Sequence, residues 1–155
     1  KGVRIYEQLA KEQSMSEAVK QKQWPRVEKW LQSGVSPDTY HLYPNGVPIL
    51  HSLARQSHTE GLELWKQYGA SFRILNLQRQ NVVHTLVQHT PQGFDPEERL
   101  AWLRDAGADV NAQDREGNTP LHLAQKANQR IWVDALIQQG ANSGLQNQAG
   151  LRALP

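Results

Sequence analysis

The stretch Asp-Arg-Glu-Gly-Asn-Thr-Pro-Leu-His-Leu-Ala, residues 114–124, decides the fold together with Leu-Ile-Gln-Gln-Gly-Ala-Asn at residues 136–142. Weaker copies of the first string can be found by spacing. His51, His84 and His122 lie 33 and 38 residues apart. Self-similarity at a nearly fixed period of this size is typical of a protein built from stacked repeats.

The residue that ends each unit is glycine. Four glycines recur at separations of 35, 38 and 33 residues, namely Gly34, Gly69, Gly107 and Gly140. Two apolar residues stand seven and four positions before each of them: Val27 and Trp30, Leu62 and Trp65, Leu100 and Leu103, Val133 and Leu136. Residues three apart share one face of a helix, and glycine is favoured where a left-handed residue ends a helix. The pattern predicts four helical units, each packing this face against the rest of its repeat.

The Thr-Pro-Leu-His string and the helix-ending glycine are the features by which the chain resembles the ankyrin-repeat family, most specifically over residues 107–150. The resemblance implies an all-α solenoid of about four helix–turn–helix repeats with terminal capping segments. Two repeats depart from the string. Residues 48–51 read Pro-Ile-Leu-His and residues 81–84 read Asn-Val-Val-His, with Arg79 where glycine is expected. These departures predict distorted turns.

We expect one ankyrin-repeat domain over residues 1–155, because a chain of this length normally makes one domain. Its expected parts are an N-terminal capping helix at 1–13, repeats at 14–44, 45–77, 78–115 and 116–148, and a partial cap at 149–155. The third repeat carries about five extra residues around Thr90–Phe94, whose Thr-Pro-Gln-Gly-Phe sequence is typical of a loop.

Two helix starts carry recognisable caps. Ser14 followed by Glu17 indicates a capping box that opens the first inner helix. Asp95 followed by Pro96 and two glutamates indicates an N-cap, a proline at the first helical position and acids in the first turn.

Composition excludes several classes of function. The chain has no Cys, so disulfides, Cys-ligated metals and thiol nucleophiles are all excluded. The net charge of +2 is too small to indicate a nucleic-acid partner. No apolar run reaches membrane-spanning length, so we expect no membrane insertion. The chain begins at Lys1 rather than Met, which we take to indicate a trimmed or processed chain, and a removed signal or lipid anchor stays open.

The histidines are the obvious metal-ligand candidates, but their spacing is wrong for a shared helix face. His84 and His89 are five residues apart, and His51 and His58 are seven apart, whereas two ligands on one helix face need three or four. The resemblance implies instead that His51, His84 and His122 hydrogen-bond between adjacent turns. No nucleophile elbow or phosphate-binding loop is present. We therefore expect no catalytic residue, no cofactor and no metal.

A basic and aromatic stretch runs from Val19 to Trp30, and this combination can bind single-stranded nucleic acid or membranes. The alternative is that Trp30 fills the core position of its repeat and that the lysines form a solvated face.

The resemblance implies that binding residues lie on the loop tips between repeats and on the exposed side of the inner helices. The candidates are Tyr40, Leu42, Tyr43, Asn45, Arg55, Leu75, Leu77, Gln78, Gln88, His89, Gln113, Arg115, Glu116 and Lys126. Aromatic and apolar residues at 40–43 are unusual for a turn. They are either binding residues, continued by Leu75 and Leu77 on the next tip, or residues that pack back onto the first repeat.

We expect a non-catalytic module that binds a folded protein partner and is a monomer when free. The resemblance extends to small bacterial ankyrin proteins, some of which are inhibitors or immunity partners of an enzyme. The alternatives are a regulatory or scaffolding part of a larger protein, or nucleic-acid binding through the basic N-terminal helices. The compartment, cytoplasmic or periplasmic, stays open.

Overall fold

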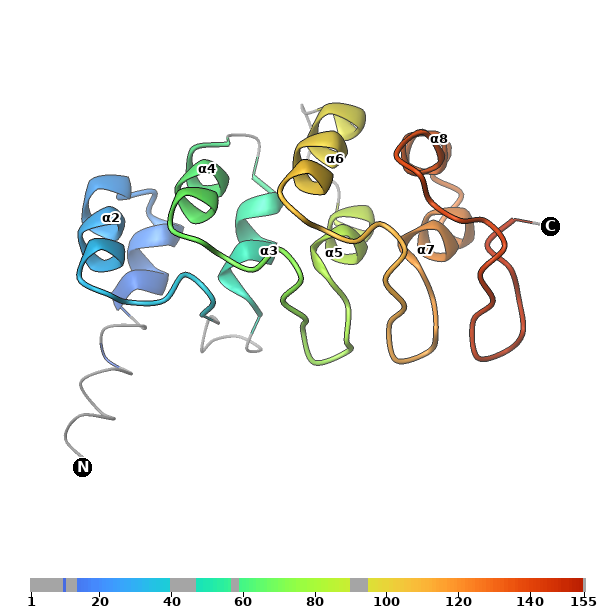
Figure 1. The fold of residues 1–155 in the computed structure, drawn as a ribbon, viewed down its shortest axis with the longest axis horizontal. Helices are drawn as coiled ribbons and strands as arrows, with labels where there is room; N and C mark the ends of the chain where they lie inside the picture. Colours follow the sequence, from blue (N-terminus) through green and yellow to red (C-terminus); the bar gives the residue numbers. More distant parts are fainter. Residues whose placement is uncertain (1–9, 11–13, 40–46, 57–58, 90–94, 155) are drawn as a thin grey trace. The chain divides into compact units, whose positions relative to one another are not determined.

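The computed structural model describes residues 10, 14–39, 47–56, 59–89 and 95–154, and the regular structure in them is helical (Figure 1). A helix at 14–20 is followed by α2 (Trp24–Gln32), α3 (Ile49–Ala54), α4 (Glu60–Gln67), α5 (Val82–Gln88), α6 (Pro96–Asp105), α7 (Pro120–Lys126) and α8 (Arg130–Gln138). Across these residues no strand forms, although an antiparallel bridge joins Gln146 to Arg152. The all-α prediction is confirmed.

The chain divides into two compact units, Lys1–Ser71 and Phe72–Pro155. In the first unit, α4 packs on both α2 and α3. Trp65 of α4 is fully buried, and its indole Nε1 donates a hydrogen bond of 2.8 Å to the carbonyl of Pro37. Gly61 lets the helices approach, because a Cβ atom there would lie 2.5 Å from the Leu53 side chain and 2.8 Å from that of Trp24.

In the second unit α5 packs on α7, α6 packs on α8, and α7 packs on α8 (Figure 1). The side chains between these helices are fully buried: Val83, Leu86, Leu100, Leu103, Leu121 and Leu136. Phe72 meets Trp102 edge to face, with ring centroids 5.6 Å apart. Two helix layers thus share one apolar core, as a stack of repeats requires.

The apolar pairs predicted from the sequence lie in these cores, with one exception. Seven of the eight side chains are buried, but Trp30 is only half-buried. The guanidinium of Arg26 lies 4.9 Å from the centroid of the Trp30 ring, a cation–π geometry. The interpretation that Trp30 fills a core position is therefore corrected, because the ring is only partly buried and Arg26 lies over it.

The helix ends follow the predicted chemistry at most places. Each of the four recurring glycines has φ between +77° and +108°, and the amide that follows it donates to the carbonyl five residues back. Asp95 accepts a hydrogen bond of 3.0 Å from the amide of Glu97, so the predicted N-cap is confirmed. Ser14 is not an N-cap, because its own backbone already belongs to the helix.

The repeat boundaries stay a prediction. The expected capping helix at 1–13, apart from residue 10, and the inserted loop at 90–94 lie outside the described residues.

Candidate protein-binding surface

Three loops in the second unit end in the same five-residue structure; we call them the first, second and third tip loops, residues 76–80, 114–118 and 147–151. In each, the amide of the first residue donates to the carbonyl of the fifth, at 2.9 Å, and the amide of the fourth donates back to the carbonyl of the first, at 2.9–3.0 Å. Figure 1 shows the loops side by side at the lower edge of this unit, below α5 and α7.

A polar side chain at the first position holds each tip loop from within. The Oδ1 atoms of Asn76, Asp114 and Asn147 each accept hydrogen bonds of 2.9–3.0 Å from the amides two and four residues later. Asx side chains favour turns for this reason. Four hydrogen bonds therefore fix each five-residue loop.

The first tip loop keeps this structure although Arg79 stands where the other two loops have glycine. The φ angle of Arg79 is +60°, against +77° at both Gly117 and Gly150. The predicted distortion of this turn is therefore wrong, because the loop's hydrogen bonds hold Arg79 in the left-handed conformation at a cost of roughly 1–2 kcal/mol. The corresponding turn of the second repeat lies outside the described residues.

Backbone hydrogen bonds also join neighbouring tip loops. The amide of Arg115 donates to the carbonyl of Gln78 at 3.1 Å, and that of Gln148 donates to the carbonyl of Glu116 at 2.9 Å. The side-chain amide of Gln113 donates to two carbonyls, those of Gly117 at 3.0 Å and Gln146 at 2.9 Å. We call the three joined loops the tip ledge.

Buried histidines anchor this ledge to the inner helices α5 and α7. Nε2 of His84 donates to the carbonyl of Asn118 at 2.8 Å, and Nε2 of His122 donates to that of Leu151 at 2.9 Å. Both acceptors are the fifth residue of the next tip loop. The prediction that these histidines hydrogen-bond between adjacent turns is confirmed for both.

The hydrogen bonds also set the tautomer of His84. Its Nδ1 accepts from the amide of Asn81 at 3.2 Å, so the proton is on Nε2. Burial lowers the pKa of His84 below the ordinary 6.5, even though its bond to the Asn118 carbonyl and the charges of Asp114 and Asp109 oppose the shift. Among the described residues, no group of three His, Asp or Glu side chains could hold a metal ion.

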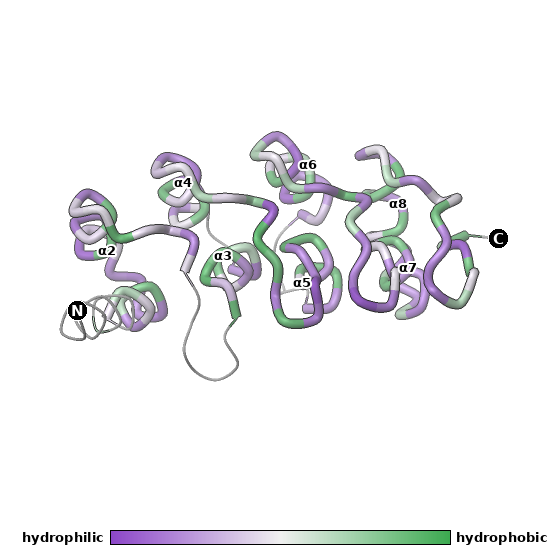
Figure 2. The backbone as a smooth tube through the Cα atoms, turned by 60° about the horizontal axis from the view of Figure 1, so that its bottom comes forward, coloured by the Kyte–Doolittle hydropathy of each residue, from purple (hydrophilic) through white to green (hydrophobic). Residues whose placement is uncertain are grey.

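The structure brings part of the predicted site together. Leu77, Gln78, Arg115 and Glu116 are exposed on the tip ledge, and Leu77 is 65 % exposed. Figure 2 shows a hydrophobic stretch running into the first tip loop. Leu75, which directly precedes that loop in the chain, is half-buried. The amide of Gln113 is already used within the ledge.

Other predicted residues lie elsewhere. Gln88 and His89 are exposed at the far end of α5, and Lys126 is exposed at the far end of α7, about 10 Å of helix away from the tips. Arg55 is exposed in the first unit. The predicted residues Tyr40, Leu42, Tyr43 and Asn45 lie outside the described residues. The sequence-based prediction of the site did not include Arg79. The sequence did offer a signal for it, namely an arginine at a position where glycine is expected.

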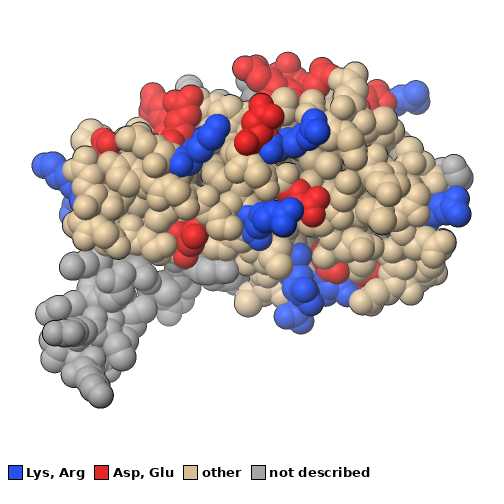
Figure 3. Space-filling view, in the orientation of Figure 1, with Lys and Arg blue, Asp and Glu red and all other residues tan. Residues whose placement is uncertain are grey.

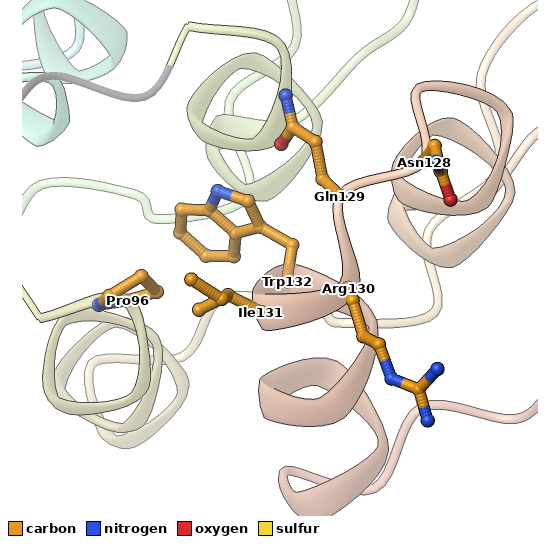
Figure 4. A pocket seen from close by; sticks show the side chains of 6 residues that line it. All are labelled: Pro96, Asn128, Gln129, Arg130, Ile131 and Trp132. Atoms are coloured by element: carbon orange, nitrogen blue, oxygen red, sulfur yellow. The ribbon is translucent and has the colours of Figure 1, made fainter.

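A separate hollow lies between the start of α6 and the turn before α8 (Figure 4). Its volume is about 350 Å³, and its lining is Pro96 with residues 128–132. The side chains of Ile131 and Trp132 point toward Pro96 across it (Figure 4). Arg130 is the one ionisable side chain among these lining residues, so they offer no acid–base pair.

Comparison with known proteins agrees with this geometry. Residues 83–137 match the family model described as ankyrin repeats (many copies). The chain is an ankyrin-repeat protein. Ankyrin repeats generally mediate protein–protein interaction, and the family is generally non-catalytic. In the part of this ankyrin protein that is described, none of the helices has the length and apolar character needed to cross a membrane.

Three relatives show how far the likeness extends. I-Kappa-B like proteins I1 and F2 of Microplitis demolitor bracovirus (isolate Webb) are 33 % and 36 % identical over 107 and 109 residues. Each match covers 66 % of this chain and 64 % of the relative. Protein PhlB of Serratia liquefaciens is 34 % identical over 131 residues, which are 82 % of this chain and 53 % of the relative. The ankyrin chain thus spans between about half and two thirds of these relatives.

Proposed function

We propose that this ankyrin-repeat chain is a non-catalytic module that holds a folded protein partner on its tip ledge and on the exposed side of α5 and α7. The observation that carries the proposal is that the groups that hold the loops of the ledge differ from the side chains that the ledge exposes. Backbone groups, the Asx side chain at the first position of each loop, Gln113 and the buried histidines hold the loops in place. Among the described residues, the exposed side chains of Leu77 and Arg115 take no part in these hydrogen bonds.

The outer side chains suit a binding role. Leu77 is a large apolar residue with 65 % of its surface in water, and Arg115 is a residue type enriched in binding hot spots. A rigid loop loses little conformational freedom on binding, so more of the contact energy contributes to affinity. The ledge is therefore a preorganised surface rather than a set of free loops.

In this proposal the module acts as an inhibitor or immunity-type partner of an enzyme, because a rigid surface of this kind would cover the region that it contacts. A second candidate is a regulatory or scaffolding part of a longer protein. The observation that favours it is coverage, since the chain spans only 53 % of Protein PhlB.

The test is capture followed by mapping. The full chain is immobilised, proteins retained from lysate and periplasm are identified by mass, and the affinity of the retained protein is measured for Leu77→Ala and Arg115→Ala. We expect each variant to weaken binding by about thirtyfold, as a hot-spot truncation of about 2 kcal/mol would. Melting temperatures should be unchanged.

The matched controls are Ile131→Ala and Arg130→Ala on α8. Ile131 is 71 % exposed, comparable to Leu77, and Arg130 is an exposed arginine. Both lie away from the tip ledge. Normal binding by the tip variants together with weak binding by these controls would move the binding surface to the outer helices and refute the proposal.

A further inference from the structure

We infer that the tip ledge recognises an acidic segment of its protein partner, with Arg79 and Arg115 forming a basic pair that receives a carboxylate beside Leu77. This inference rests on the proposed function and names the chemistry of the partner. It starts from Arg79, because this arginine stands where the other two tip loops have glycine.

Arg79 occupies a position that favours glycine. It has φ +60°, and the same position in the other two tip loops is Gly117 and Gly150. Within the described residues its guanidinium makes no hydrogen bond or ion pair, and its side chain is exposed. Backbone strain that the surrounding structure holds in place clusters at ligand-binding positions.

Arg115 lies next to this residue on the neighbouring loop. Its amide donates to the carbonyl of Gln78, which directly precedes Arg79 in the chain. In the part of the chain that the structure describes, the Arg115 guanidinium is also without a hydrogen bond or ion pair. Figure 3 shows basic side chains, with acidic side chains beside them, at the lower edge of this unit, where Figure 1 places the tips of these loops. Arg73, by contrast, lies 3.9 Å from Asp109.

The two acidic residues that flank Arg115 in the sequence already accept hydrogen bonds within the second tip loop. Asp114 accepts hydrogen bonds from the amides of Glu116 and Asn118, at 2.9 Å each. Glu116 accepts one of 3.4 Å from the side chain of Asn118. Two guanidinium groups on a rigid support can each bind a carboxylate in a bidentate manner. Exposed Leu77 adds an apolar contact, so the matching segment carries both an acid and an apolar residue.

A nucleic-acid partner fits the same surface less well. Phosphate-driven binding needs a longer basic stripe, and the ledge interleaves Glu116 with its two arginines. Stacking of single-stranded bases needs aromatic side chains, and none of the residues at 76–80, 114–118 and 147–151 is aromatic. We therefore assign the ledge to a protein segment.

The experiment titrates short synthetic peptides into the full ¹⁵N-labelled chain and follows the backbone amide resonances. One peptide alternates Glu with Leu, and its control alternates Gln with Leu. We expect the acidic peptide to shift the amides of residues 77–80 and 115–117 selectively, with an affinity that falls as salt rises. Arg79→Gln or Arg115→Gln should weaken the binding severalfold, and the double variant should abolish it.

The matched control is Arg130→Gln, an exposed arginine away from the ledge, which should bind as the unmodified chain does. If Arg79→Gln unfolds, Arg79→Gly removes the same charge and relieves the backbone strain. Equal binding by the Gln–Leu peptide, undiminished binding by the double variant, or tighter binding of oligothymidylate at the tips would each overturn the inference.

The two proposals fail separately. A captured partner that is sensitive to Leu77→Ala but binds normally to the double arginine variant would leave the protein-binding role intact and refute acidic recognition. Failure of all tip variants to affect the captured partner would refute the binding surface itself.

Discussion

The repeats that begin with α5 and α7 form the same structure from different residues. Residues 81–84 read Asn-Val-Val-His and residues 119–122 read Thr-Pro-Leu-His, with only the histidine in common. Yet both N-caps have extended backbone, with ψ of −176° at Asn81 and 166° at Thr119. In both, the histidine at the third helical position accepts a hydrogen bond from the cap amide and reaches the next tip loop.

The difference lies in how each cap is satisfied. Asn81 accepts from two amides of the first turn, and its Nδ2 donates to the carbonyl of Asp109 at 2.7 Å. Thr119 accepts from one amide and is followed by Pro120, whose fixed φ suits the start of a helix. The repeat is thus specified by positions that must donate, accept or pack, and several residue types can fill each of them.

The largest expected effect is a loss of stability from the buried core, compared at equivalent positions of the two repeats. Leu121 and Val83 occupy equivalent positions and are both fully buried. Leu121→Ala should lower the free energy of unfolding by about 2–5 kcal/mol, whereas Val83→Ala should have a smaller effect because it removes less buried hydrocarbon. Urea denaturation followed by circular dichroism measures both. Surface substitutions usually change the free energy of unfolding by less than about 0.5 kcal/mol. A change of that size for Leu121→Ala would show that Leu121 does not belong to the core.

The next largest effect is a change in stability on substitution at the fourth position of the tip loops, compared between Gly117 and Arg79. In Gly117→Ala a Cβ atom would lie 2.8 Å from the amide nitrogen of Gln148, at a residue with φ +77°, so we expect a loss of about 1–2 kcal/mol or more. Arg79→Gly should instead stabilise the chain by about 1 kcal/mol or less, because the relief of strain is partly offset by backbone entropy. The same denaturation curves report both, and a marked loss in Arg79→Gly would show that its side chain supports the fold.

The smallest effect concerns pH. The pKa of His84 is lowered on folding, so the unfolded chain binds the extra proton more readily. Its contribution to stability is complete above the ordinary pKa of 6.5 and is lost as the pH falls below that value toward the pKa of the folded state. Chemical denaturation at about pH 7.5 and about pH 5.5 should show a smaller stability difference for His84→Gln than for the unmodified chain. An equal difference in both would show that His84 does not contribute to the pH dependence.

The sequence predicted the features that depend on short separations. The recurring glycines, the apolar pairs and the Asp95 cap are local, because their partners lie within a turn or two of helix. The regular turn at Arg79 could not be predicted, because a residue type alone does not show whether the surrounding hydrogen bonds will hold a left-handed backbone. For Trp30, spacing gave the helix face but not how much of that face the rest of the unit covers.

The candidate site shows the same limit. Its positions could be found by their offset from the repeat motif, as for Leu77 and Arg115. The sequence could not show whether a side chain at such a position is free to bind a partner, because that depends on a neighbour about one repeat away. Gln113 is the example, since its side chain donates to the carbonyl of Gln146. Arg79 was missed for a different reason, because an arginine at a glycine position was taken to predict a distorted turn rather than a binding residue.

The backbone hydrogen bonds between neighbouring tip loops bear on how such a protein can change over time. Every residue except proline supplies the same amide and carbonyl, so residues 77, 78, 115 and 148 can be exchanged without removing a bond that joins the loops. Selection can then alter what this surface recognises one side chain at a time, with little loss of stability at each step. The same property makes these four positions suitable sites for a randomised library or for grafting a new recognition sequence.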